Sequence, residues 1–280
     1  MKNFIKLVNF ELNRFFPIYA ALGGLTILIQ IIGVFVTTNG YVSQIEEIKK
    51  TGITQESQII SDIGMMGMNR FVGGVGGLWF WAPVALCVVT LIIYSLFIWY
   101  RDWLGKNTFI YRLLMLPTER INLYFSKAVT IFLMVLGLVA LQLVLIVLEG
   151  QLFSMLLPEA YFEATSINQL TTHSMYLQMF YPSSLIFFLS HYSKGFLAIL
   201  VAFTCVLFER CFKVKGIFMA GLYAGLVLAI MLLPYWIQIF LNNSMLFNSE
   251  IFWISLGLTV IMALVSTWIS HRLLNRKITV

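Results

Sequence analysis

Charged side chains are scarce in this sequence, since only 11% of its 280 residues are Asp, Glu, Lys or Arg, whereas 60% are hydrophobic. A soluble globular protein keeps about 25% charged residues because its surface faces water. The scarcity of charge, together with a mean hydropathy of +0.90, excludes an ordinary soluble domain, a disordered chain and a coiled coil. The chain must present most of its surface to lipid.

Groups that perform catalysis or bind metals are also sparse. The three cysteines, Cys87, Cys205 and Cys211, show no C-x-x-C spacing, which favours neither a disulfide framework nor a zinc site. The sequence contains no G-x-x-x-x-G-K-[ST] phosphate-binding loop and no H-E-x-x-H motif, so neither ATP hydrolysis by that loop nor metalloprotease chemistry is expected. We therefore expect that this chain is not an enzyme, has no catalytic or metal-binding residue, and binds no cofactor of its own.

Long apolar runs are what the sequence contains instead of charge. Five of them have no charged residue or histidine, and each has the roughly 20 residues that a helix needs to cross about 30 Å of hydrocarbon. The sixth contains His191 and Lys194: either its helix begins near Leu185, which we favour, or residues 184–194 lie flat on the outer surface. We predict an all-α, single transmembrane domain over residues 1–280, with spans at about 15–36, 78–100, 128–148, 184–208, 217–241 and 251–270.

The basic residues are distributed unevenly among the segments that connect these spans. With the N-terminus inside, 14 of the 18 basic residues are cytoplasmic, and eight of the twelve acidic residues are outside. Lys and Arg accumulate on the cytoplasmic side of membrane proteins, so the pattern predicts a multi-pass membrane protein with both termini in the cytoplasm, which we expect to be in a bacterial plasma membrane. The extracellular loops are then residues 37–77 and 149–183, and the net charge of +6 requires no nucleic-acid partner.

Residues 1–16 have the spacing of an amphipathic helix, with basic and amide side chains on one face and Phe, Ile, Val and Leu on another. A basic polar face allows such a helix to lie in the headgroup layer, and Pro17 would mark the bend into the first span. The alternative is a merely basic flank that fixes orientation. The residues assigned to this interfacial helix are Phe4, Ile5, Val8, Leu12 and Arg14.

The cytoplasmic segment 101–127, between the second and third spans, is amphipathic. Pro117 fits the first turn of a new helix, where Thr118 and Glu119 supply polar groups beside free backbone N–H groups. The run at 113–116 is too apolar to face water. It should dock on a protein partner or lie back against the membrane.

Together these features resemble the ABC-2 type permeases of ATP-binding-cassette exporters. The resemblance rests on the N-terminal amphipathic helix, the six spans, Arg101, Gly105, the run Leu-Leu-Met-Leu-Pro-Thr-Glu-Arg at 113–120, and Ser126-Lys127 at the entry to span three. It implies a connecting helix at 2–16 and a coupling helix at roughly 114–122 that docks on a separate ATPase subunit. The residues of this coupling loop are Gly105, Leu114, Met115, Leu116, Pro117, Thr118, Glu119 and Arg120.

The function implied by this resemblance is that of a permease subunit that exports a hydrophobic or amphipathic peptide, or confers resistance to one. Its partners would be a cytosolic ABC ATPase subunit that binds ATP and Mg, a second permease subunit and membrane lipid. Spans without internal charge suit such a cargo better than a small ion. The alternatives are a lipid-moving ABC permease, or a non-transporting membrane anchor or sensor that recruits a cytosolic partner.

Two groups of small residues allow two interpretations each. Residues 73–77 are rich in glycine and predict either a flexible or a closely packed entry to the second span. On the fifth span, Gly221 and Gly225, with the alanines that precede them, form a face suited to close helix packing. That packing could occur within the bundle or between subunits.

Overall fold

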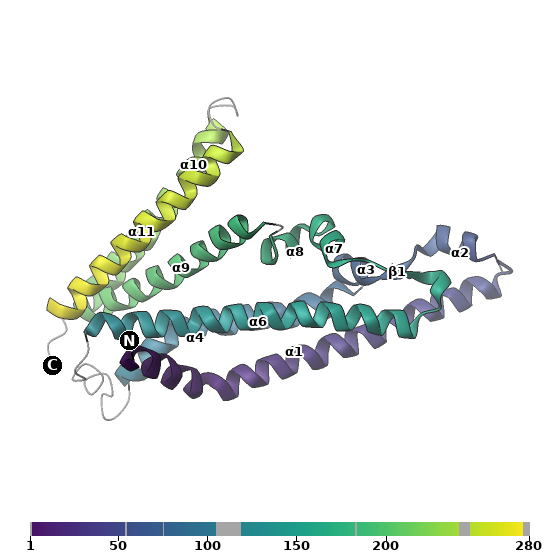
Figure 1. Ribbon diagram of the computed structural model, residues 1–280, viewed down its shortest axis with the longest axis horizontal. Coiled ribbons are helices and arrows are strands. Elements are labelled where there is room, and N and C mark those ends of the chain that lie inside the picture. The colour runs from purple at the N-terminus through teal and green to yellow at the C-terminus, as the bar shows by residue number, and fades with distance from the viewer. Residues whose placement is uncertain are drawn as a thin grey trace. The chain divides into compact units, whose positions relative to one another are not determined.

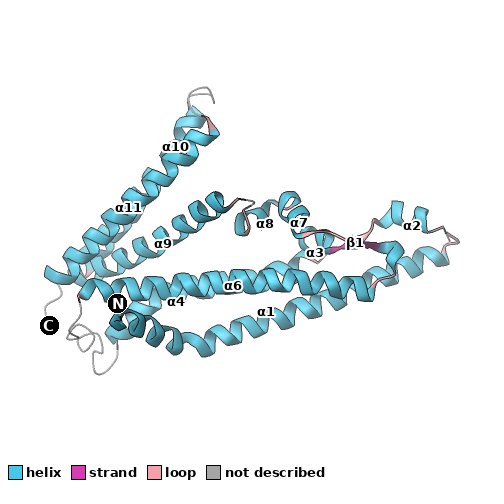
Figure 2. Cartoon of the chain, in the orientation of Figure 1, coloured by secondary structure: helices cyan, strands magenta, loops and turns pink. Residues whose placement is uncertain are grey.

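The computed structural model describes residues 2–53, 55–74, 76–104, 119–182, 184–240 and 247–276, and they are mostly helical (Figure 2). Six helices in this part of the chain are long and apolar enough to cross a membrane, which indicates a multi-pass membrane protein. The prediction of an all-α protein with six long apolar helices that could span a membrane is confirmed. The six are α1 (Lys2–Lys50), α4 (Gly77–Leu104), α6 (Arg120–Leu156), α9 (Leu185–Phe212), α10 (Val214–Phe240) and α11 (Asn248–Arg276).

The helices extend beyond the apolar runs that predicted them. Helix α1 has 49 residues and contains Pro17, so the helix is not interrupted where we expected the chain to bend into the first span. Proline removes one backbone donor, and neighbouring groups in a membrane helix can compensate for that loss. After the second span, α4 continues to Leu104, and α6 begins at Arg120. The segment that connects the second and third spans is therefore shorter than the predicted 101–127.

Helix α9 resolves the two interpretations of the fourth span. It is continuous from Leu185 to Phe212 and includes His191 and Lys194. The helix therefore begins near Leu185, as the favoured interpretation held. The polar pair falls in its first three turns, where a long lysine stem can direct the ammonium group toward the headgroups.

Contacts within the chain separate it into two units. Unit 1 consists of Met1–Arg14, Leu91–Leu133 and Leu189–Val280, and unit 2 of Phe15–Thr90 and Met134–Phe188. Helices α1, α4 and α6 contribute residues to both units, as does the first turn of α9.

Hydroxyl groups join the helices of unit 1. Thr204 on α9 and Ser270 on α11 lie 3.0 Å apart, oxygen to oxygen. Tyr223 on α10 and Ser266 on α11 are 2.6 Å apart, and α10 and α11 lie side by side (Figure 1). The Tyr124 hydroxyl of α6 donates to the carbonyl of Leu200. Such interhelical hydrogen bonds stabilise helix association in lipid, where no water is present to satisfy the polar groups.

In unit 2, contacts between α1, α4 and α6 fit an alternating passage of the spans. The Gln30 amide on α1 donates to the carbonyl of Phe80 near the start of α4, and Thr26, one turn earlier on α1, contacts Cys87 further along α4. These two helices are therefore antiparallel. Tyr19 on α1 donates to the carbonyl of Met134 on α6.

The two predicted outer loops fold together in unit 2. Their short elements are α2 (Glu56–Ile63), β1 (Met66–Gly67), α3 (Met68–Gly73), the 3-10 turn η1 (Glu159–Tyr161), β2 (Phe162–Glu163), α7 (Ile167–His173) and α8 (Met175–Phe180). Strands β1 and β2 pair in parallel, so that Met66 is opposite Phe162 and Gly67 opposite Glu163. A capping box at Ser166 and Gln169 begins α7.

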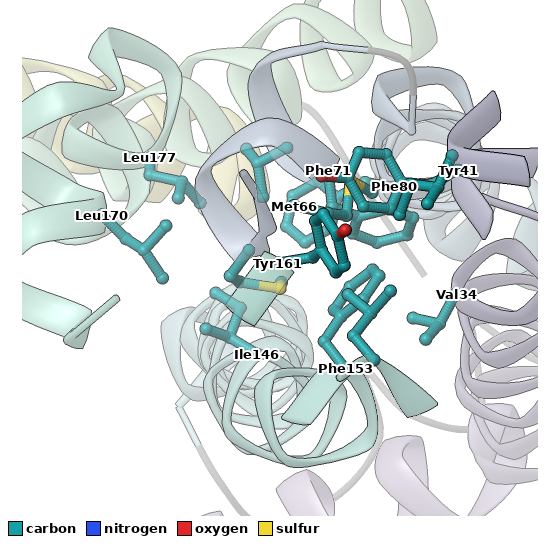
Figure 3. Packing of buried hydrophobic residues seen from close by; sticks show 14 of the residues in the cluster. Val34, Tyr41, Met66, Phe71, Phe80, Ile146, Phe153, Tyr161, Leu170 and Leu177 are labelled. Atoms are coloured by element: carbon teal, nitrogen blue, oxygen red, sulfur yellow. The ribbon is translucent and has the colours of Figure 1, made fainter. Parts of the chain in front are cut away.

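A cluster of buried hydrophobic residues, here called the aromatic core, holds these elements together (Figure 3). Its aromatic members are Tyr41, Phe71, Phe80, Phe153 and Tyr161. Phe71 of α3 is fully buried, with its ring centroid 5.3 Å from that of Phe153 on α6 and 6.2 Å from that of Phe80 on α4. A Cβ atom built on Gly76 would overlap the Phe71 ring. At Gly76 the entry to the second span is therefore closely packed, because only glycine fits beneath that ring, whereas a Cβ atom built on Gly73 meets nothing within 4 Å.

Candidate functional site

The candidate site is a network of buried charges in unit 1, centred on Lys127 near the start of α6. The Lys127 ammonium donates to Glu11 of α1 at 2.6 Å and to Asp102 of α4 at 2.5 Å. All three side chains are at most 2% exposed. One cation thus joins three helices that are far apart in the sequence.

Two arginines complete the network from its more exposed side. Arg101 donates to the second oxygen of Glu11 at 3.0 Å, and Arg14 donates to the second oxygen of Asp102 at 2.9 Å. Each carboxylate therefore accepts one bond from Lys127 and one from an arginine. With two acids and three bases, the network carries a net charge of +1.

An aromatic side chain lies beside the central cation. Lys127 Nζ lies 5.6 Å from the centroid of the Trp99 ring, and its ammonium group also lies 3.4 Å from the carbonyl oxygen of Ile98. Trp99 in turn packs edge-on against Phe203 of α9, at 5.6 Å between ring centroids. A cation above an aromatic face is attracted to the ring quadrupole, most strongly when water is excluded.

The network lies at the base of the segment that connects α4 to α6. Asp102 is near the end of α4 and Lys127 is in the second turn of α6. Their ion pair therefore joins the two helix ends that residues 105–118 connect. Glu11 adds the N-terminal helix to the same point. These residues stand just outside the uncharged runs 15–36, 78–100 and 128–148.

Burial decides what this arrangement can do. Removing one partner from a buried ion pair leaves an uncompensated charge, which costs about 3–5 kcal/mol. The three helix ends are therefore held in a specific register and should move as one body. Among the described residues, no group of His, Cys, Asp and Glu has a metal-binding arrangement.

Three further contacts join neighbouring helix ends of unit 1. The Tyr100 hydroxyl of α4 donates to the carboxylate of Glu209 on α9, and the Arg210 guanidinium stacks 4.6 Å above the Tyr100 ring. Arg120, the first residue of α6, donates to the carbonyl of Leu274 in the last turn of α11, at 2.7 Å. A cation at a helix C-terminus is stabilised by the helix dipole.

Most of the predicted coupling-loop residues, namely Gly105, Leu114, Met115, Leu116, Pro117 and Thr118, lie outside the described residues. Glu119 is exposed, and its carbonyl accepts the backbone N–H of Asn122. Arg120, which the resemblance placed in the coupling loop, bonds within the chain to α11.

The residues assigned to the interfacial helix have different environments. Ile5 is exposed, as a lipid-facing residue would be, and Phe4 and Leu12 are partly buried. Val8 is buried, and its carbonyl lies 3.5 Å from the Thr130 hydroxyl of α6. Arg14 belongs to the charge network.

The sequence reasoning missed Glu11 and Asp102 and assigned Lys127 only to the entry of span three. A signal was present, because these carboxylates are two of the few acidic residues on a side that is otherwise basic. An acid beside a membrane span needs a nearby cation when it is buried. The sequence did not reveal which cation, since the partners are 25 to 116 positions away.

Of the two interpretations of the small-residue face on α10, the structure does not support packing within the bundle. Gly221 and Gly225 are exposed, and a Cβ atom built on either meets nothing within 4 Å. Within the described part of the chain this face therefore does not support close helix packing. It is available to lipid or to another subunit.

Comparisons of this chain with protein-family models, with curated proteins and with solved structures find no match.

Proposed function

We propose that this protein is the membrane subunit of an ATP-binding-cassette exporter of the ABC-2 type, powered by a separate ATPase subunit. The observation that supports it best is the ion pair of Lys127 with Glu11 and Asp102. A coupling loop can move spans only if its two ends are firmly attached to them. The charge network supplies that attachment for the segment 105–118.

The proposed mechanism follows from the position of the network. The apolar run at 113–116 docks on the ATPase, and closure of the ATPase displaces the loop. Because Asp102 and Lys127 are paired and buried, the displacement passes to α4 and α6 together and to α1 through Glu11. ATP binding then biases a pair of permease subunits between two packings of their helices.

The cargo that we propose is a hydrophobic or amphipathic peptide. In five of the six predicted spans the apolar run contains no charged residue. A path along these spans therefore offers no charged partner for a small ion. The folded outer part of unit 2, built from α2, α3, α7 and α8 around the aromatic core, gives such a transporter a structured region outside the spans. A lipid cargo is the competing possibility within the same class.

The test begins with purification of the tagged protein from its native membrane in mild detergent, followed by identification of co-purifying proteins and an assay of ATP hydrolysis. We expect a stoichiometric ATPase subunit with a phosphate-binding loop. The double variant Leu116→Asp with Pro117→Gly should insert normally but lose stimulated hydrolysis. The matched control makes the same two changes in an outer segment, Leu156→Asp with Pro158→Gly, and should retain it.

Two outcomes would contradict the proposal. Full stimulated hydrolysis in the Pro117 double variant would remove the loop from the mechanism. Recovery of the folded protein without an ATPase would instead favour the anchor or sensor, because that function needs the amphipathic loop and the stable bundle but no energy source.

A further inference from the structure

Unit 2 contains a groove of about 330 Å³ between α6 and the segment that runs from β2 into α7. On the α6 side it is lined by Ile146, Val147, Gly150, Gln151 and Ser154. On the other side it is lined by residues 162–167 and Leu170, and Ile146 and Leu170 are both labelled in Figure 3. The lining is mainly apolar, so the groove fits an apolar side chain.

Gly150 makes the groove accessible. A Cβ atom built on this residue meets nothing within 4 Å, whereas the nearby buried residues Ile146 and Phe153 of the same helix belong to the aromatic core. A larger side chain at position 150 would therefore occupy the groove without displacing the backbone.

The groove begins where the third span ends. Ile146 and Val147 are the outermost part of the uncharged run 128–148, and Gly150 to Ser154 follow it in the same helix. Its walls therefore start at the predicted outer membrane surface and continue away from the lipid. Amphipathic peptides concentrate at this interface, with the apolar face in the acyl boundary and the charged face in the headgroups.

Charge indicates the chemistry of the occupant. Glu163, an exposed residue of β2, is the only charged residue among the described residues that line the groove. The outer segments 37–77 and 149–183 together contain seven acidic and three basic residues, and one of the three, Arg70, already donates to the carbonyls of Ile63 and Gly64. An apolar groove with an acidic rim favours an apolar side chain that is flanked by positive charge.

We propose that this groove is the capture site for a cationic amphipathic peptide, which inserts an apolar side chain above Gly150 and places a lysine or arginine beside Glu163. This inference rests on the proposed function and specifies the cargo as cationic and its first contact as unit 2. Capture at the outer surface is what resistance to a peptide requires. It precedes any step that uses ATP, so it can be measured without nucleotide.

The experiment uses the full chain in phosphatidylcholine nanodiscs and a fluorescein-labelled 18-residue peptide of leucine and lysine, with binding to empty nanodiscs subtracted. We expect saturable binding that is lost when glutamine replaces every lysine of the peptide. Gly150→Phe should weaken binding at least about tenfold, because the apolar anchor of the peptide is worth about as much as one buried leucine. Glu163→Gln should weaken it about threefold, as expected for an exposed charge pair.

Matched controls separate the groove from general effects. Gly40→Phe introduces the same side chain on α1 at a position where a Cβ atom also meets nothing within 4 Å. Glu159→Gln removes an exposed acid close in sequence that does not line the groove. Both controls should bind the peptide like the unmodified protein, and thermal unfolding of Gly150→Phe should match that of Gly40→Phe.

The outcomes distinguish this inference from the proposed function. Equal peptide binding by Gly150→Phe and Gly40→Phe would show that the groove is not the capture site, even if the ATPase coupling holds. Loss of a bound lipid from Gly150→Phe in native mass spectrometry, with peptide binding unchanged, would overturn it as well. Groove-dependent peptide binding without any ATPase partner would support the capture site while removing the pump.

Discussion

Lys127 and Asp102 are 25 positions apart in the sequence, yet the Lys127 ammonium lies 2.5 Å from an Asp102 oxygen and neither side chain is exposed. The segment 105–118 connects the two helices that carry these residues. A buried ion pair at the ends of a connecting segment holds the adjoining helices together while the segment itself interacts elsewhere. We regard this relationship as the main structural reason for the proposed coupling function.

The network should make a measurable contribution to stability. Lys127→Met leaves Glu11 and Asp102 buried without their shared cation, which should cost about 3–5 kcal/mol and lower the thermal unfolding temperature in detergent. The matched control is Lys6→Met, which makes the same change at an exposed lysine of α1. Equal unfolding temperatures for the two variants would show that the network does not hold the helices together.

Close packing of α1 on α4 depends on Gly33. A Cβ atom built there would overlap the Trp79 Cβ atom, so Gly33→Ala should destabilise the protein by about 1–3 kcal/mol, as overpacking does. Gly24→Ala, on the same helix, should be neutral or stabilising by up to about 1 kcal/mol, because its Cβ atom meets nothing within 4 Å and alanine favours the helix. Thermal unfolding of the two purified variants measures the difference. A stable Gly33→Ala protein would contradict the close approach.

We expect Glu149 on α6 to lower the stability of unit 2. Its side chain is fully buried, and neither carboxylate oxygen has a hydrogen-bond partner among the described residues. Leaving such a group unsatisfied costs about 1–3 kcal/mol. Glu149→Met, which keeps a similar volume, should therefore raise the unfolding temperature, whereas Glu159→Met, at an exposed position, should leave it unchanged. A lower unfolding temperature for Glu149→Met would show that the carboxylate has a stabilising partner in the native membrane.

The orientation predicted from basic residues can be tested by labelling. In a protein whose three cysteines have been replaced by alanine, Gln55→Cys should react with a membrane-impermeant maleimide on intact cells. Lys215→Cys, in the first turn of α10, should react only after the membrane is permeabilised. Both positions are exposed, so a difference between them reports the side of the membrane. If Lys215→Cys reacted on intact cells and Gln55→Cys only after permeabilisation, the protein would have the opposite orientation in the membrane.

Long apolar runs, five of them free of charge and histidine, made the six spans predictable, because the length of a helix that crosses hydrocarbon is fixed by the thickness of the bilayer. The ends of the helices were less predictable. Residues 37–50 are mainly polar, yet they continue α1, because Tyr41 and Ile45, four positions apart on one face of the helix, are buried in the aromatic core. Helices α4 and α6 likewise extend into the segment predicted as a loop, where Asp102 and Lys127 are buried and paired.

The sequence by itself determined the class of this protein: scarce charge and long apolar runs require a multi-pass helical membrane protein, whatever the details of packing. Only the tertiary structure decided that Glu11, Asp102 and Lys127 meet, and that two separate outer segments pair through Met66 and Phe162. The physical reason is range. Hydrophobicity acts on each segment independently, whereas an ion pair or a strand pairing depends on where residues distant in the chain are brought together.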